Sequence, residues 1–136
     1  MQILESDITN HGLAQHARRA ADLFRAGDFD KLAMDYGYAI ANGRNPADAM
    51  REDLEHALFG SGRADYSAVE FRADPSAGVE LLRYGGNELA IAAAYEGIEL
   101  AQCGERVAVF DLVVFSTSEA GLHVAIEDLY EREFAA

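Results

Sequence analysis

Cysteine is almost absent from this chain of 136 residues, since Cys103 is the only one. A single thiol excludes an intrachain disulfide and a thiolate metal cluster. Basic residues are also scarce, because 11 Lys and Arg stand against 24 Asp and Glu, which gives a net charge of −13. A surface this negative repels phosphate backbones and anionic lipids, so we expect no nucleic-acid partner and no membrane partner.

Long apolar runs, targeting signals and cofactor motifs are also lacking. No apolar run approaches the roughly 18 residues that a membrane-spanning helix needs. The first seven residues show neither the basic nor the apolar part of a signal peptide. The four histidines show no metal-ligand spacing, and no glycine-rich phosphate loop is present. We therefore expect one cytoplasmic domain spanning residues 1–136, with no metal and no cofactor.

The first half of the sequence carries the pattern of helices. Apolar residues recur at helical spacing along its first stretch: Leu13, Ala17, Ala20, Ala21 and Phe24. Gly27 ends this helix, and Asp28 is the expected N-cap of a second helix that runs to Tyr36. Asn45 as cap and Pro46 at the first helical position open a third helix, which ends at the glycines that follow residue 59.

The second half changes to the pattern of strands. Alternation, β-branched residues and turn signals predict strands at residues 69–72, 79–84, 87–99, 106–116 and 122–130. Gly85-Gly86 predicts a two-residue hairpin turn, and a second turn is expected at 118–121. Helices followed by an antiparallel meander predict an α+β fold with the helices packed on one face of the sheet.

The strand predicted at 106–116 is apolar on both faces. Phe110, Leu112 and Val114 point one way, and Val109, Val113 and Phe115 point the other way. One helical layer covers only one face of a sheet, so the outer face needs a second cover. We expect a homodimer formed through this outer face. The alternative is that the sheet curls over itself or that the termini cover it.

Two segments resemble the nuclear transport factor 2-like superfamily, which includes SnoaL-type polyketide cyclases and ketosteroid isomerases. The first is Leu23-Phe24-Arg25-Ala26-Gly27-Asp28-Phe29-Asp30-Lys31-Leu32, and the second runs from Val109 through Phe115 and a turn at Gly121 to Tyr130. The resemblance implies a strongly curved antiparallel sheet wrapped around the helices as a cone. It also implies a dimer, with the cone serving either as a catalytic pocket or as a binding cavity.

Asp111 is the candidate catalytic residue. It is the only acid within the strand at 106–116, where burial among apolar side chains should raise its pKa. The resemblance places it at the oxyanion-holding acid of ketosteroid isomerases, and we expect it to project into the cup with Val109, Val113 and Phe115. The alternative is an aspartate that bonds a neighbouring strand or faces solvent.

The rest of the isomerase set is missing, because its tyrosine falls at Ala20 and its general base near Arg44. Tyr36, Tyr38 and Tyr95 are candidate ligand-binding residues, or alternatively buried rings with satisfied hydroxyls. His123 is a further candidate, because it shares a strand face with Glu127 and such a pair could shuttle a proton. The alternative for His123 is an exposed polar edge.

Two functions remain open from the sequence. The first is a SnoaL-like protein that binds a small apolar molecule in its cone, with Asp111 as anchor or acid, either as a plain binder or as a cofactor-free isomerase, cyclase or hydrolase. The second is a non-catalytic dimeric binding or interaction module whose cone is filled by its own side chains.

Overall fold

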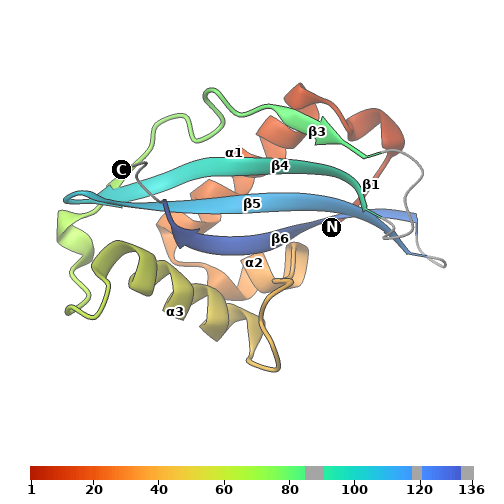
Figure 1. Ribbon diagram of the computed structural model, residues 1–136. Coiled ribbons are helices and arrows are strands. Elements are labelled where there is room, and N and C mark those ends of the chain that lie inside the picture. Colours follow the sequence, from red (N-terminus) through yellow and green to blue (C-terminus); the bar gives the residue numbers. More distant parts are fainter. Residues whose placement is uncertain (85–90, 118–120, 133–136) are drawn as a thin grey trace.

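Three N-terminal helices pack on a strongly curled six-stranded antiparallel sheet, a half-barrel that confirms the predicted α+β class (Figure 1). The computed structural model describes residues 1–84, 91–117 and 121–132. The helices are α1 (Asn10–Ala26), α2 (Phe29–Asp35) and α3 (Pro46–Phe59), and two 3₁₀ turns are η1 (Glu5–Asp7) and η2 (Tyr66–Ala68). None of the helices in the described ranges is long and apolar enough to cross a membrane.

The helix boundaries follow the capping residues that the sequence offers. Asp28 accepts a hydrogen bond from the Lys31 N–H at the start of α2, and Asn45 accepts one from the Asp48 N–H at the start of α3. Gly27 ends α1 with a φ of 71°, a left-handed conformation that glycine adopts at little cost. The predicted junctions of all three helices are therefore confirmed.

The sheet has the strand order β1-β6-β5-β4-β2, and β3 pairs with β4 off this path. Its strands are β1 (Gln2–Ile3), β2 (Glu70–Phe71), β3 (Leu81–Arg83), β4 (Ile91–Cys103), β5 (Arg106–Thr117) and β6 (Gly121–Glu131). The long strands β4 to β6 form the meander that the sequence predicts. β1 is missed by the sequence analysis because two residues carry no periodicity.

Some predicted elements are shorter in the structure. The strand expected at 69–72 is reduced to β2 behind the turn η2, and the strand expected at 79–84 is reduced to β3. The turn expected at Gly85-Gly86 and most of the turn expected at 118–121 lie outside the described residues.

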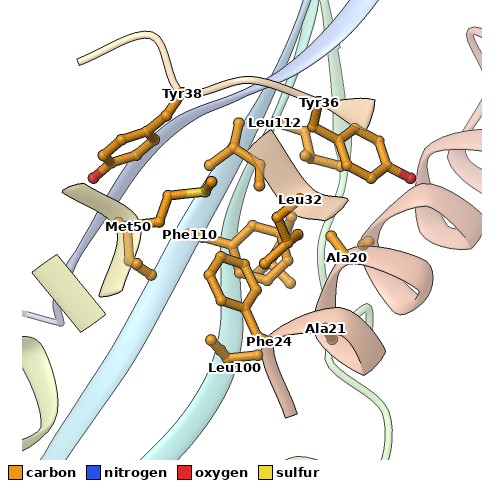
Figure 2. Packing of buried hydrophobic residues seen from close by; sticks show 14 of the residues in the cluster. Ala20, Ala21, Phe24, Leu32, Tyr36, Tyr38, Met50, Leu100, Phe110 and Leu112 are labelled. Atoms are coloured by element: carbon orange, nitrogen blue, oxygen red, sulfur yellow. The ribbon is translucent and has the colours of Figure 1, made fainter. Parts of the chain in front are cut away.

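The hydrophobic core lies between the helices and one face of the sheet (Figure 2). The Phe24 ring of α1 packs 5.4 Å from the Phe110 ring of β5 and 6.1 Å from the Phe29 ring of α2, measured between centroids. Leu112 and Leu32 fill the adjoining space, and both are fully buried. The chain's own side chains therefore pack the interior where the helices meet the sheet.

Candidate functional site

Asp111 lies on the sheet face turned away from the helices. Its neighbours Phe110 and Leu112 belong to the core, and side chains alternate between faces along a strand. The prediction that Asp111 projects into the cup between sheet and helices is therefore wrong in its placement. The error arises because β5 is apolar on both faces, so its sequence does not indicate which face meets the helices.

The Asp111 carboxylate is half-buried, and one of its oxygens accepts two hydrogen bonds. Oδ1 accepts hydrogen bonds from the Gly97 N–H at 2.8 Å and from the Tyr130 hydroxyl at 2.9 Å. Burial raises the pKa of Asp111, and Asp128 directly opposite on β6 raises it further, whereas the two hydrogen bonds lower it. Oδ2 has no hydrogen-bond partner among the described residues, which leaves it free to bind a proton or a ligand atom.

Negative charge gathers around Asp111. Burial raises the pKa of Glu127, and the charges of Asp111, Glu96 and Asp128 raise it further. The pKa of the Tyr130 hydroxyl is also raised, by burial and by its bond to Asp111. The pKa values of Asp111 and Glu127 are therefore both raised, chiefly by burial.

The other residues expected on this strand face lie with Asp111. Val109, Val113 and Phe115 share its side of β5, and the His123 ring of β6 stacks on Phe115 with 5.7 Å between centroids. The structure thus brings together five of the predicted site residues, but on the outer face of the sheet.

The predicted tyrosines Tyr36 and Tyr95 lie on the opposite side, in the core. Tyr36 is buried, and its hydroxyl lies 3.1 Å from Nδ1 of His16. Tyr95 pairs with the core residue Leu112, and its hydroxyl lies 3.5 Å from the Ser76 carbonyl oxygen. Burial raises the pKa of both tyrosines. They do not share a pocket with Asp111.

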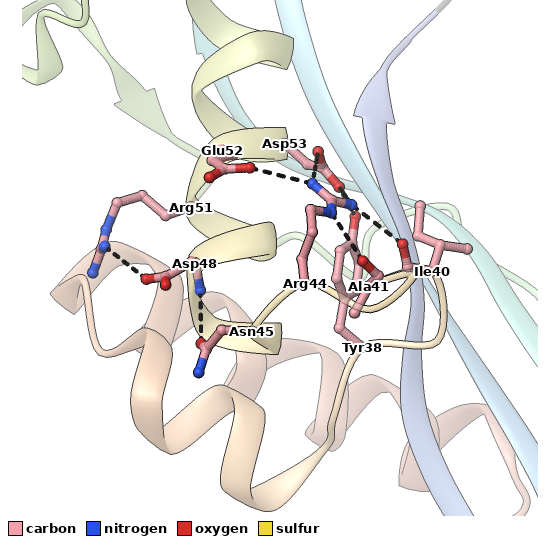
Figure 3. A network of polar contacts seen from close by, with 9 residues as sticks. All are labelled: Tyr38, Ile40, Ala41, Arg44, Asn45, Asp48, Arg51, Glu52 and Asp53. Atoms are coloured by element: carbon pink, nitrogen blue, oxygen red, sulfur yellow. Dashed lines mark hydrogen bonds and ion pairs between the residues drawn. The ribbon is translucent and has the colours of Figure 1, made fainter.

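Tyr38 is held in a polar network between the loop after α2 and the helix α3 (Figure 3). Its hydroxyl donates to Asp53 Oδ2 at 2.6 Å, and the Arg44 guanidinium contacts both oxygens of the same carboxylate at 3.1 and 3.2 Å. Arg44 also donates to the Ala41 carbonyl at 2.9 Å. This network fixes the loop to α3 and uses the Tyr38 hydroxyl in doing so.

A row of apolar side chains crosses four strands on the outer face. Leu82 of β3 lies opposite Ala94 of β4, Ala94 lies opposite Val113 of β5, and Val113 lies opposite Ala125 of β6. We call these four residues the outer row. Residues opposite each other in adjacent antiparallel strands point to the same side of a sheet, so the row is continuous. No described helix covers this face, which is turned toward the viewer in Figure 1.

A groove of about 480 Å³ lies on the outer face, and two of its lining residues, Gly97 and Tyr130, hydrogen-bond to Asp111. The rest of its lining is mostly charged and consists of Glu99, Val109, Asp128, Glu131 and Arg132. Charged groups and a phenol of this kind can orient a small ligand.

Leu82, Ala94, Ala125 and Gly97 also belong to this surface, although the sequence does not single them out. Strand register decides which residues align across a sheet, and register is not visible in the sequence of a single strand. The one available signal is Gly97, because a glycine inside a strand marks a bulge or a close approach, and here its N–H bonds Asp111.

Comparisons with family models, curated proteins and solved structures found no match to this chain. Within the described ranges, no group of three His, Cys, Asp or Glu side chains is placed to hold a metal ion.

Proposed function

We propose that this protein is a non-catalytic binding module that pairs with a second copy of itself through the outer face of its sheet. The observation that carries the proposal is the outer row, an uncharged apolar strip across four strands that no described helix covers. Its member Leu82 is largely exposed, and an apolar sheet face without a covering layer is a candidate interaction surface.

The shape of the outer face suits a second copy. Leu82 is 46% exposed and Tyr84 is 43% exposed, so their side chains project at one end of the face. The middle of the face is recessed, because Ala94, Val113 and Ala125 have small side chains that are each at most 8% exposed. A two-fold axis would place the raised end of each copy on the low middle of the other, which makes the surface self-complementary.

The charge of the chain sets the salt response of this pairing. Two copies that each carry a net charge of −13 repel one another, and salt screens that repulsion. Burial of the apolar row does not depend on such screening. Pairing should therefore strengthen as salt concentration rises, whereas attraction to a basic partner would weaken.

The resemblance to the nuclear transport factor 2-like superfamily supports this proposal, because it implies a curved sheet on helices and a dimer. The filled interior also favours a module over an enzyme, since the space that the resemblance assigns to a ligand holds Phe24, Leu32, Phe110 and Leu112.

Replacing Val113 with glutamate tests the pairing. A charge buried in the middle of the outer row is expected to weaken the dimer at least about 100-fold. Met34→Glu is the matched control, because Met34 is 83% exposed on α2 and its replacement adds the same charge away from the sheet. Sedimentation velocity of both variants should show a monomer for the first and a dimer for the second.

Leu82→Glu serves as a second variant, because Leu82 is exposed and its replacement leaves the core intact. It is also expected to dissociate the dimer. If Val113→Glu and Leu82→Glu, both folded by circular dichroism, sediment like Met34→Glu, the outer row is not the pairing surface.

A second candidate function rests on the groove beside Asp111. The unpartnered Oδ2 and the raised pKa of Asp111 suit an anchor or acid for a small, largely apolar molecule. Such a ligand would raise the melting temperature of the wild type, and Asp111→Asn would abolish that rise. A monomer that responds to a ligand in this way would favour this candidate over pairing.

Asp111→Asn also has an expected effect on the free protein. The folded-state pKa of Asp111 is raised, so the folded state holds the proton more tightly and the free energy of unfolding falls as pH rises through that pKa. Asparagine keeps the Oδ1 acceptor for Gly97 and Tyr130 but removes the charge opposite Asp128. At pH 7 the variant should be more stable than wild type by up to about 1 kcal/mol.

The difference in the free energy of unfolding should shrink between pH 7 and pH 4, because protonation of the wild-type carboxyl removes its charge. Chemical denaturation at both pH values measures it, with Glu105→Gln as the control because Glu105 lies in the exposed turn before β5. A variant less stable than wild type at pH 7 would show that the Asp111 charge is favourable where it lies.

A further inference from the structure

A second pocket lies away from the outer face, between α1 and the segment that follows β2. It has a volume of about 240 Å³. Arg18, Asp22 and Arg25 line it from α1, at positions that share one helix face, and Phe71 and Arg72 line it from the other side. Three of the chain's 11 basic residues thus line one small pocket in a protein that carries 24 acidic ones.

The three arginines differ in their partners. The Arg72 guanidinium lies 3.1 Å from Glu99, which lies opposite Val109 on the outer face, so this ion pair holds it away from α1. Arg18 lies 3.8 Å from Asp74, and both of these side chains are about half exposed. Arg25 forms no ion pair with a described residue. Its guanidinium donates to the Arg72 carbonyl at 3.3 Å and lies 5.5 Å from the centre of the Phe71 ring.

An aromatic groove continues from this pocket. It has a volume of about 460 Å³ and shares Arg25 and Phe71 with the pocket. Its walls add Phe29 and Tyr66, and the Arg51 guanidinium lies 5.0 Å from the centre of the Phe29 ring. The two hollows therefore adjoin, one bordered by arginines and the other by rings.

We propose that the pocket and groove together bind a small organic anion with an aromatic body. The carboxylate of such a ligand would lie between Arg18 and Arg25, because a planar guanidinium matches a carboxylate with two parallel hydrogen bonds. The ring of the ligand would lie along Phe71 toward Tyr66, where aromatic side chains favour offset or edge contacts. The site is separate from the pairing surface, so either proposal can fail alone.

Titration of the ¹⁵N-labelled protein with 4-phenylbutyrate, followed by NMR, tests this site. Amide shifts are expected around Ala21, Arg25 and Phe71. The neutral analogue 4-phenylbutan-1-ol and inorganic phosphate should each bind at least about tenfold more weakly, since each lacks one of the two required groups.

Arg25→Gln should weaken 4-phenylbutyrate binding at least about tenfold. Arg63→Gln removes the same charge from an exposed residue that lines neither hollow, and it should bind as the wild type does. Arg18→Gln replaces the first variant if the spectrum of Arg25→Gln shows misfolding.

Four results would overturn the proposal, and the first three concern relative affinities. These three are equal binding of the acid and the alcohol, equal binding of the acid and phosphate, and an undiminished affinity in the arginine variants. Absence of any shift with 4-phenylbutyrate would also exclude this class of ligand.

Discussion

Phe110→Ala is expected to lower the free energy of unfolding by about 3–5 kcal/mol, because it removes a buried ring and leaves a cavity. Phe110 is fully buried, and its ring touches the Phe24 ring of α1 at 5.4 Å between centroids. It therefore joins the centre of the sheet to the first helix. A loss this large approaches the whole stability of a small domain, so the variant should be largely unfolded at 37 °C.

Phe115→Ala is the matched control, since it removes the same ring from the outer face of the same strand. Phe115 is only partly buried and stacks on His123. Removing its ring should lower the free energy of unfolding of the monomer by about 1 kcal/mol. Urea denaturation measures this free energy for both variants, and an equal decrease in the two would contradict the assignment of the two faces of β5.

Gly60→Ala is the second large effect, with an expected loss of about 2 kcal/mol. Gly60 caps α3 with φ of 60° and ψ of −128°, a conformation in which a side chain is strained. A Cβ there would also lie 3.1 Å from the Arg106 guanidinium. That guanidinium donates to the His56 and Ala57 carbonyls at the end of α3 and pairs with Glu131 of β6.

Gly27→Ala isolates the backbone part of this effect. Gly27 has φ of 71° and ψ of 21°, a left-handed conformation that alanine enters at a cost of about 1 kcal/mol. A Cβ added at Gly27 would meet no atom within 4 Å, so its substitution adds no steric clash. In thermal unfolding, the melting temperature of Gly60→Ala should be lower than that of Gly27→Ala. The reverse order would show that the end of α3 rearranges without strain.

The sequence predicts the fold well where a local signal decides the outcome. Asn45, Pro46 and Gly27 mark helix ends by their backbone and capping chemistry, and the structure confirms each of them. The strand predicted at 87–99 is present as β4 despite its alanine-rich middle. In these cases the information lies within a few residues of the position predicted.

The sequence predicts the site less well, because the site depends on long-range geometry. The sequence correctly indicates that burial raises the pKa of Asp111. It does not indicate which face of β5 carries this residue. The outer row depends on the registers of β3, β4 and β6, and the bulge at Gly97 shifts one of them. Tyr38 and Asp53 meet only through the turn of the chain between α2 and α3.

The central claim is that the outer face of the sheet is a pairing surface. Sedimentation equilibrium of the wild-type chain across a dilution series in low and high salt tests it most directly. The expected result is a mass twice the 14.8 kDa of one chain, with dissociation on dilution that salt opposes. A mass of 14.8 kDa at every concentration up to about 100 μM would contradict it, because an interface of standard size would be populated there.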